Sequence, residues 1–411
     1  MSSEYRYFLA LTSQLPFCGI PLRLDSSSRC QFACRYCFVS ARGGAASPKS
    51  LKIADPSSLK NRLSRVARGQ VRSALDEMLD RKVPIHFGGM SDPFMPHTIE
   101  TGTTRKLLET LASHRYPTII STKSDLVASP EFTELLCGGR FAVQLSFSSP
   151  NDKFARYVDS GTPSPTNRIA AAETLSKHGI PVGFRHQPLF PGRESEISEL
   201  MGQASGVGAS HYAVEYYKHP AELAWAHRDR LNSALGFDLD EFYKKLGSRR
   251  SGREWILPVE YRLDTILSAR QQAHKLGLSF GAADSDLLHL SDGEVCCSGA
   301  DILGFGGGLR FNFLTAVRKG LQTGEVRFND IRDEWRPQGS IAHFVNSTSR
   351  RDSRTVTDYI QRRWNGVTSG PSPAAFYGVE ATQDFDDAGF KIYVVSEQVR
   401  AMRSEDKLLE A

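Results

Sequence analysis

The chain has 411 residues, of which 40% are hydrophobic and 24% are charged, and its formal net charge at pH 7 is +5. This composition is ordinary for a soluble globular enzyme of two or three domains, or of one barrel with an extension. No apolar run reaches the roughly eighteen residues that span a bilayer, and no basic region with an apolar stretch opens the chain. We therefore expect neither a membrane span nor a signal peptide, and we predict a cytoplasmic location.

Short apolar runs alternate with helical patterns from about residue 20 to residue 220. This alternation is typical of βα units around a parallel sheet, which curls into a barrel with reactive groups at the carboxyl ends of its strands. A doubly wound open sheet would place polar residues at the same ends, so this alternative stays open. The predicted strands are 20–25, 84–90, 117–124, 141–149, 180–192 (with its loop) and 211–217, and the predicted helices are 56–81, 100–114, 130–137, 164–178 and 194–207.

The rhythm of the chain loosens beyond residue 220. Segment 284–308 is polar and rich in glycine, which indicates a functional or packing loop. The predicted architecture is an α/β fold with a partial (β/α)6-type TIM barrel in residues 1–220. A mixed α+β extension in residues 221–411 is expected to cover the barrel mouth and the substrate. Its predicted helices are 259–276, 309–320 and 354–364, and its predicted strands are 278–283 and 389–395.

Three of the seven cysteines, Cys30, Cys34 and Cys37, form a C-x3-C-x2-C array. Three thiolates on one short loop hold three irons of a 4Fe–4S cluster and leave the fourth iron open. Zinc is the competing interpretation, but a structural zinc site needs four ligands, and the nearest downstream histidine is His86. An odd cysteine count without an export signal disfavours a disulfide. The array therefore predicts an iron–sulfur cluster with a vacant coordination position.

Further motifs follow the array in a characteristic order. An aromatic residue, Tyr36, precedes the last cysteine, and GGMSDPFMP, TRKLLETL, TIISTKSDLV, QLSFSSPND and TNRIAAAETLSKHGIPVGFRHQPLFPG come after it. Over about residues 30–215 the sequence resembles the radical S-adenosylmethionine (radical SAM) enzymes, in the branch similar to spore photoproduct lyase and DNA repair photolyases. The combined motifs are much more specific than any single one.

The resemblance implies a chemistry and its cofactors. S-adenosylmethionine would chelate the open iron of a 4Fe–4S cluster, and reductive cleavage would yield methionine and a 5′-deoxyadenosyl radical that abstracts hydrogen from a substrate. A reductant protein of flavodoxin or ferredoxin type would supply the electron. The subclass, whether lyase, transferase or oxidoreductase, stays open.

The resemblance also assigns residues to S-adenosylmethionine. Gly88 and Gly89 match the family's glycine pair, whose backbone would receive the ammonium group, although Met90 and Ser91 separate this pair from the acid Asp92. Arg168 would pair with the carboxylate, and Arg185 is the alternative. Each polar residue has simple capping as its other interpretation. The predicted cofactor-binding residues are Phe38, Gly88, Gly89, Asp92, Ser121, Lys123, Ser124, Ser146, Ser148, Arg168 and Arg185.

The vicinal pair Cys296 and Cys297 lies outside the barrel motifs. Spore photoproduct lyase uses a cysteine as hydrogen donor, so this pair is a candidate for that role, although its position does not match the family's. Buried packing in a glycine-rich loop is the alternative. A second cluster is disfavoured because it needs about four ligands and only Cys18 and Cys137 remain.

Two stretches of the chain are strongly basic: Arg42 to Arg72, and Lys244 to Glu254. Each is either a solvated face or a phosphate-tracking surface beside the active site. A nucleic-acid base or lesion is therefore the first candidate substrate. A peptide or a small metabolite is the second candidate, and a non-catalytic iron–sulfur nucleic-acid-binding or sensor protein is the third interpretation.

Overall fold

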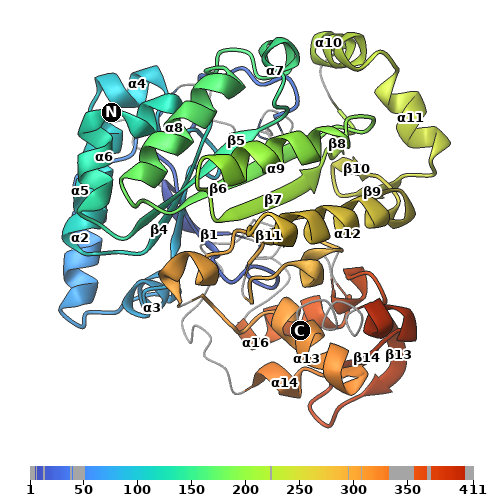
Figure 1. The fold of residues 1–411 in the computed structure, drawn as a ribbon. Helices are drawn as coiled ribbons and strands as arrows, with labels where there is room; N and C mark the ends of the chain where they lie inside the picture. The colour runs from blue at the N-terminus through green and yellow to red at the C-terminus, as the bar shows by residue number, and fades with distance from the viewer. Residues whose placement is uncertain are drawn as a thin grey trace.

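The computed structural model describes residues 5, 7–12, 14–37, 39, 51–222, 225–294, 296–306, 308–332, 356–367 and 372–402 (Figure 1). Phe38, which is expected to pack either against the adenine of the cofactor or in the core, lies outside the described residues, as do residues 42–50 of the first basic stretch. In the described part of the chain, no helix is both long and apolar enough to cross a membrane.

One eight-stranded sheet dominates the structure, in the order β1-β2-β3-β4-β5-β6-β7-β11. Within this sheet, β2 to β7 and β11 run parallel to one another, and β1 pairs antiparallel with β2. Because β2 to β7 are neighbours in sequence order, the sheet has no switch point of the doubly wound kind. Among the described strands, β1 and β11 end the sheet without pairing with each other, which confirms a partial barrel. The strands are β1 (Leu9–Leu11), β2 (Leu22–Leu24), β3 (Ile85–Phe87), β4 (Thr118–Thr122), β5 (Phe141–Phe147), β6 (Val182–Leu189), β7 (His211–Tyr216) and β11 (Ser279–Ala282).

Helices cover the outer face of this sheet (Figure 1). The expected single helix over 56–81 is wrong, because the chain leaves the helix at Gly69, whose φ is +76°, and a second helix begins after the cap Ser73. The seven-residue helix α7 was not predicted. The helices around the barrel are α2 (Pro56–Ala67), α3 (Ala74–Asp80), α4 (Pro96–Glu100), α5 (Thr103–Ser113), α6 (Pro130–Cys137), α7 (Asp152–Val158), α8 (Pro165–Lys177), α9 (Glu196–Gly206) and α12 (Val259–Lys275).

The amino-terminal end of the barrel is closed by residues 296–305, which we call the floor segment. Its apolar side chains pack against Ile119 and Ala142, the second residues of β4 and β5. A Cβ on Gly281 in β11 would collide with the carbonyl oxygen of Cys297, so this strand position needs glycine. The imidazole of His211 donates from Nε2 to the same carbonyl at 2.9 Å. The glycine-rich loop of the sequence is thus a plug inside the barrel.

The remaining described residues form two small sheets with their helices. One has the order β8 (His219–Pro220), β10 (Glu254–Ile256), β9 (Arg249–Ser251), and the other β12 (Glu325–Val326), β14 (Lys391–Val395), β13 (Val379–Phe385). Backbone hydrogen bonds from Leu309 to Gly19 (2.6 Å) and from Phe313 to Pro16 (2.6 Å) attach the C-terminal region to the segment between β1 and β2. Further helices are α10 (Trp225–Leu235), α11 (Leu239–Lys245), α13 (Phe313–Thr323), α14 (Asn329–Arg332) and α16 (Val356–Trp364).

Candidate active site

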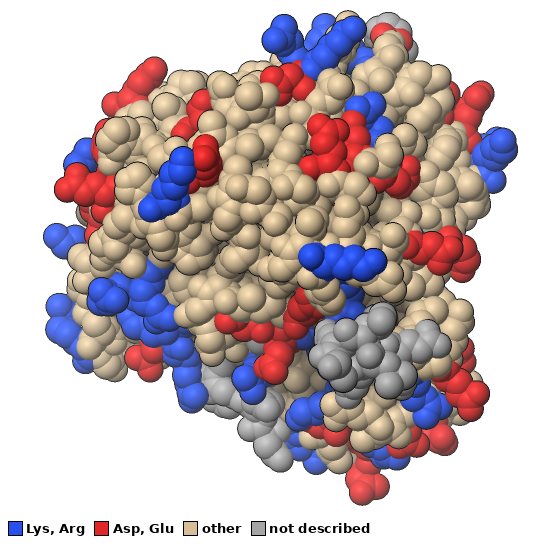
Figure 2. Space-filling model, viewed as in Figure 1, with Lys and Arg blue, Asp and Glu red and all other residues tan. Residues whose placement is uncertain are grey.

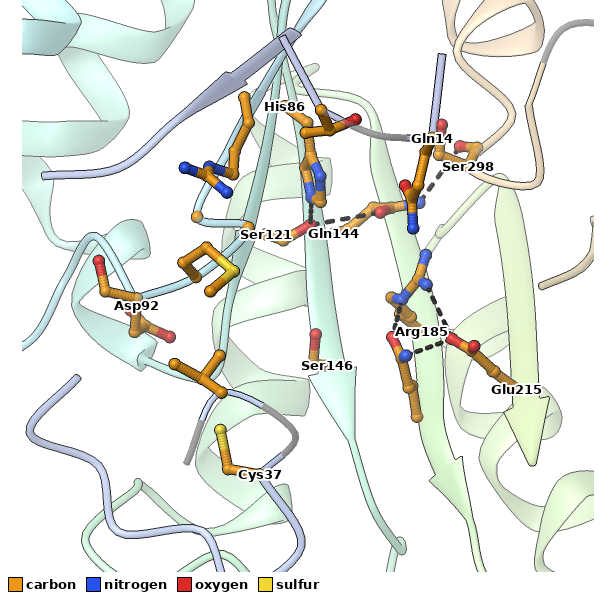
Figure 3. Close-up of a pocket in the computed structure, with 18 of the residues that line it drawn as sticks. Gln14, Cys37, His86, Asp92, Ser121, Gln144, Ser146, Arg185, Glu215 and Ser298 are labelled. Atoms are coloured by element: carbon orange, nitrogen blue, oxygen red, sulfur yellow. Dashed lines mark hydrogen bonds and ion pairs between the residues drawn. The ribbon is translucent and has the colours of Figure 1, made fainter. Parts of the chain in front are cut away.

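A cavity of about 670 Å³ lies inside the barrel. The loop that carries Cys37 borders one end, and Gln14 and Ser298 lie at the other (Figure 3). The strands run toward the cysteine loop, so this end is the carboxyl end of the barrel, where barrel enzymes carry their active sites. Predicted site residues in the cavity wall are Cys30, Cys34, Cys37, Gly88, Gly89, Asp92, Ser121, Lys123, Ser146, Arg185, Cys296 and Cys297.

The cysteine loop is fastened to the end of α7. The amides of Ala33 and Arg35 donate to the carbonyls of Ser160 and Val158, both at 2.9 Å. Between these carbonyls, Asp159 accepts a hydrogen bond from the hydroxyl of Tyr36. The loop therefore takes its position from a helix more than a hundred residues further along the chain.

Asp159 is a buried carboxylate with several partners. It pairs with Lys123 at 3.3 Å and Arg168 at 3.1 Å, and it accepts from the Ser148 hydroxyl at 2.8 Å. Burial alone would raise its pKa, but the two cations and the hydroxyl donors outweigh burial and lower the pKa to about 2. A permanently charged Asp159 thus holds the loop, and the sequence analysis missed this residue.

The donor set of the loop fits an iron–sulfur cluster. All three thiols line the cavity, and burial raises the pKa of Cys34 well above its ordinary value, so iron would have to displace a proton. Among the described residues, no three His, Cys, Asp or Glu side chains converge on one metal ion. A structural zinc site takes four protein ligands, whereas an iron–sulfur cube takes one thiolate for each iron, which matches three cysteines on one loop.

The glycine pair approaches other backbone closely. Gly88 has a φ of +101°, and a Cβ there would collide with the carbonyl oxygen of Ser121. A Cβ on Gly89 would lie 2.8 Å from Cγ of Arg23. Buried Asp25 accepts the Met90 amide at 2.7 Å, which fixes the loop that follows the pair. Both glycines line the cavity, and neither position has room for a side chain.

Asp92 lies in the wall, but its oxygens are already engaged. Oδ2 accepts the Lys123 amide at 2.6 Å, and Oδ1 accepts the Thr122 hydroxyl at 2.8 Å. Burial raises its pKa above the ordinary value. Asp92 therefore joins the ends of β3 and β4.

Three predicted cofactor contacts do not line the cavity. Ser124 caps a short helix at Leu126, with a distance of 3.3 Å, and Ser148 binds Asp159. Arg168 is fully buried and donates to Asp159 and to the carbonyl oxygens of Ser146 and Pro163. The alternative arginine, Arg185, does face the cavity (Figure 3).

A row of polar side chains crosses the cavity wall, and of its members the sequence analysis predicted Ser121 but not His86 or Gln144. A ring nitrogen of His86, Nε2, lies 2.7 Å from the Ser121 hydroxyl, and this hydroxyl lies 3.4 Å from Gln144 (Figure 3). The Gln144 amide donates to the Ser298 carbonyl at 3.2 Å. Burial, then the nearby cations Arg185 and Arg23, lower the pKa of His86 to about 4, so this row is neutral at pH 7. Its sequence signal was a polar residue between apolar neighbours in a strand, His86 in IHF.

Charged side chains lie on the neighbouring strands β6 and β7. Glu215 of β7 pairs with Arg185 at 3.3 Å and also binds Gln187 and Lys218. Burial opposes the charge of Arg185, but nearby Cys297 and Glu215 outweigh it and raise the pKa of this guanidinium. The cluster therefore offers a fixed cation to a polar group in the cavity.

A second set of thiols lies at the floor. Sγ of Cys18 is 3.7 Å from Sγ of Cys296, and Cys18, Cys296 and Cys297 all line the cavity. The remaining cysteine, Cys137, is exposed at the end of α6 and lies outside the cavity wall.

Parts of the chain are similar to known proteins. Residues 25–201 match the model of the Radical SAM superfamily. No curated protein matches the chain. Solved structures that match include spore photoproduct lyase complexed with dinucleoside spore photoproduct, at 16% identity and a TM-score of 0.49, covering 67% of this chain and 79% of that one. Another is Streptococcus suis SuiB bound to precursor peptide SuiA, at 17% identity and a TM-score of 0.37, covering 56% and 47%. Residues 25–201, which hold the cysteine loop and strands β3 to β6, are thus similar to a radical SAM domain.

Proposed function

We propose that the protein binds a 4Fe–4S cluster on Cys30, Cys34 and Cys37 and removes a hydrogen atom from a substrate in the cavity. The observation that carries this proposal is that one cavity is lined by the cysteine loop, by the glycine pair and by the charged side chains of β6 and β7. When bound, the cluster and S-adenosylmethionine supply the 5′-deoxyadenosyl radical, while the protein orients the reactants and excludes water.

Different residues of the cavity bind different groups of S-adenosylmethionine. The carbonyls of Gly88 and Gly89 receive the ammonium group, and Ser121 and Ser146 bind polar groups of the ligand. Arg185 pairs with a carboxylate of the ligand, because Arg185 lines the cavity, whereas Arg168 lies outside the cavity wall and is held by Asp159. Arg168 is thus a positioning residue for the cysteine loop. Phe38 keeps its predicted adenine contact as a proposal.

A nucleic-acid base is the proposed substrate, and the β9–β10 hairpin supports it. Arg249, Arg250 and Arg253 are exposed on this hairpin, and Trp255, opposite Arg250, is 36% exposed. Glu254, which lies between Arg253 and Trp255 in the sequence, lines the cavity, so the hairpin borders the cavity. Cations beside an exposed aromatic ring are the pattern by which proteins bind single-stranded nucleic acid.

The first basic stretch supports this substrate less. Two of its arginines, Arg62 and Arg65, pair with buried Asp76 at 2.7 and 2.9 Å. Others, such as Arg68 and Arg72, follow the end of α2, at the amino-terminal side of the barrel. Lys and Arg gather over this α2–α3 corner (Figure 2), away from the cysteine loop.

A small metabolite or peptide is the second candidate. The floor segment and residues 7–20 both contribute to the cavity wall, and about 670 Å³ is an ordinary volume for a pocket that takes small molecules. A flipped-out base would suit the same space.

The activity test starts with anaerobic reconstitution. About four irons per chain and formation of 5′-deoxyadenosine from S-adenosylmethionine after reduction are expected. The triple variant C30A/C34A/C37A should lose both, and C137A should keep both. A colourless protein that binds zinc and forms no 5′-deoxyadenosine would end the proposal.

The substrate test uses a labelled single-stranded oligonucleotide. The pair R250E/R253E should weaken binding at least tenfold and reduce the salt slope by about two. The control pair R68E/R72E carries the same charge change on the α2–α3 corner and should leave binding nearly unchanged. Equal losses in both variants, or no binding at low salt, would favour the small-molecule candidate.

A further inference from the structure

The side chains inside the barrel change in chemical character with depth. Along β5, Ala142 packs against the floor segment, whereas Gln144 and Ser146 line the cavity. Side chains two residues apart lie on the same face of a strand. Because a strand rises about 3.3 Å per residue, Ser146 is nearer to the cysteine loop than Gln144 by about 7 Å.

The neighbouring strands carry side chains in the same order. Ser121 of β4 is paired in register with Gln144, and Arg185 of β6 is paired with Ser146. His86 of β3 joins Ser121 through their contact of 2.7 Å. A level of neutral polar side chains, which we call the middle level (His86, Ser121 and Gln144), thus lies between the apolar floor and the charged side chains nearer to the cysteine loop.

The middle level suits an uncharged ligand group. Its hydroxyl and its amide carry no charge, and burial, then the cations Arg185 and Arg23, lower the pKa of His86 to about 4. Both arginines are already partly neutralised by carboxylates, at 3.3 and 2.7 Å. A phosphate or carboxylate at this depth would lose its hydration with only partial compensation, which costs free energy.

Gln14 adds a second amide to this level. It lies in the segment between β1 and β2, and its exposed side chain lines the cavity. Figure 3 shows Gln14, Gln144 and Ser298 at the end of the cavity away from Cys37. In the described part of the chain the Gln14 amide has no hydrogen-bond partner, whereas Gln144 uses one N–H for the Ser298 carbonyl at 3.2 Å. Since each amide carries two donors and an acceptor oxygen, the two glutamines offer donors and acceptors to the cavity.

We propose that Gln14 and Gln144, with His86 beside them, form a subsite that binds the hydrogen-bonding edge of a nucleobase; we call it the amide subsite. This inference rests on the proposed function and names the part of the substrate that enters the barrel. Nucleobase edges present donors and acceptors side by side, and a glutamine amide pairs with such an edge through two hydrogen bonds.

The two parts of a nucleotide bind at different depths in this arrangement. The uncharged base reaches the amide subsite, as in enzymes that take a single base out of its stack. The phosphates stay outside the barrel, where Arg250 and Arg253 are exposed on the β9–β10 hairpin. Base identity is therefore read inside the barrel, while the hairpin arginines add affinity without regard to sequence.

The first experiment measures base preference. The reconstituted enzyme with S-adenosylmethionine is titrated with single-stranded oligonucleotides of equal length, made only of deoxyadenosine, deoxycytidine or thymidine. The strongest and weakest affinities should differ at least tenfold, because each base presents a different edge. In Q14A this ratio should fall at least fivefold with an unchanged urea midpoint, since the Gln14 amide has no partner to lose. Equal affinities in the wild type, or an unchanged ratio in Q14A, would overturn the inference.

Two control variants separate base contacts from phosphate contacts. Q70A removes an exposed amide outside the cavity wall and should keep the ratio. R250E/R253E should weaken the binding of all three strands by similar factors and so keep the ratio as well. A ratio that falls in R250E/R253E as much as in Q14A would place base recognition at the hairpin and overturn the amide subsite.

The second experiment asks whether a base reaches Gln14. In Q14C, alkylation of the new thiol by N-ethylmaleimide is followed by peptide mass spectrometry, with Q70C as the control outside the cavity. The strand that binds best, at saturation, should slow alkylation of Q14C at least fivefold and leave Q70C unchanged. A strand of the same length that carries sugars and phosphates but no bases should protect neither. Equal protection of Q14C by both strands, or protection by neither, would overturn the inference.

Formation of 5′-deoxyadenosine by the wild-type enzyme decides the proposed function separately. If it forms while Q14C stays unprotected, the amide subsite is overturned and the proposed function stands. If it does not form, the proposed function fails, and base-dependent protection of Q14C would still place a base in the cavity.

Discussion

The two ends of the barrel each carry three cysteines, but they are built in different ways. At the carboxyl end, the thiols lie within eight residues, and charge holds their loop through Asp159. At the amino-terminal end, the thiols come from positions 278 residues apart, and apolar packing with glycine contacts holds them. The first arrangement suits a set of metal ligands that must stay fixed. The second brings together thiols that lie far apart in the sequence, with Sγ of Cys18 3.7 Å from Sγ of the buried Cys296.

Among the changes considered, removal of the Asp159 carboxylate should have the largest effect on the free energy of unfolding, and it should affect the carboxyl end of the barrel rather than the floor. D159A would leave Lys123 and fully buried Arg168 without their carboxylate, and breaking a buried pair costs about 3–5 kcal/mol. We expect a lower urea midpoint and loss of iron after reconstitution. A disulfide crosslink that the thiol oxidant diamide forms between Cys18 and Cys296, whose sulfurs lie 3.7 Å apart at the floor, should persist.

The matched control for this change is E109Q. Glu109 pairs with Arg105 at 2.8 Å, but both side chains are about half exposed, so the loss should stay below about 1 kcal/mol. If D159A and E109Q cost the same, charge does not hold the cysteine loop.

A change at Gly281 should have the reverse pattern of effects from D159A, because it should disturb the floor and leave the cysteine loop intact. In G281A the new methyl group meets the backbone carbonyl of Cys297, which cannot rotate away, and such overpacking costs about 1–3 kcal/mol. Because the floor segment must shift, the yield of the Cys18–Cys296 crosslink should fall, whereas iron binding at the carboxyl end should remain.

The control is G202A in α9, where a Cβ meets nothing within 4 Å. An alanine there should stabilise the helix by about 0.5–1 kcal/mol and leave both sets of thiols unchanged. An unaltered crosslink in G281A would show that the floor segment does not depend on this contact.

The sequence predicted the carboxyl end better than the floor, for a physical reason. Cluster ligands on one loop have a spacing that is visible locally, and the predicted strands and most helices follow from hydrophobic periodicity. Asp159 and Cys18 act through contacts with residues far away in sequence, so no local pattern marks them. Arg168 is a further example. Its position in the sequence predicted a contact with the cofactor carboxylate, but in the fold its guanidinium pairs with Asp159.

The smallest of these expected effects is a pH dependence of the free energy of unfolding. It arises from Asp284 and Asp286, which follow β11 at the carboxyl end of the barrel. Both contact buried Arg262, at 3.3 and 2.7 Å. Burial raises the pKa of Asp284 to about 6, whereas hydrogen bonds and charge from Arg262 overcome burial and lower the pKa of Asp286.

The signs of these two shifts are opposite. The stabilisation from Asp284 is full below its unfolded pKa of about 4 and is lost as pH rises through 6, while that from Asp286 is full above about 4 and is lost at lower pH. Stability should therefore fall by about 1–2 kcal/mol from pH 5 to pH 7 through Asp284, since one pKa unit corresponds to about 1.4 kcal/mol. Urea unfolding of D284N should remove this decline, because an amide does not titrate. A decline that persists in D284N would assign it to another group.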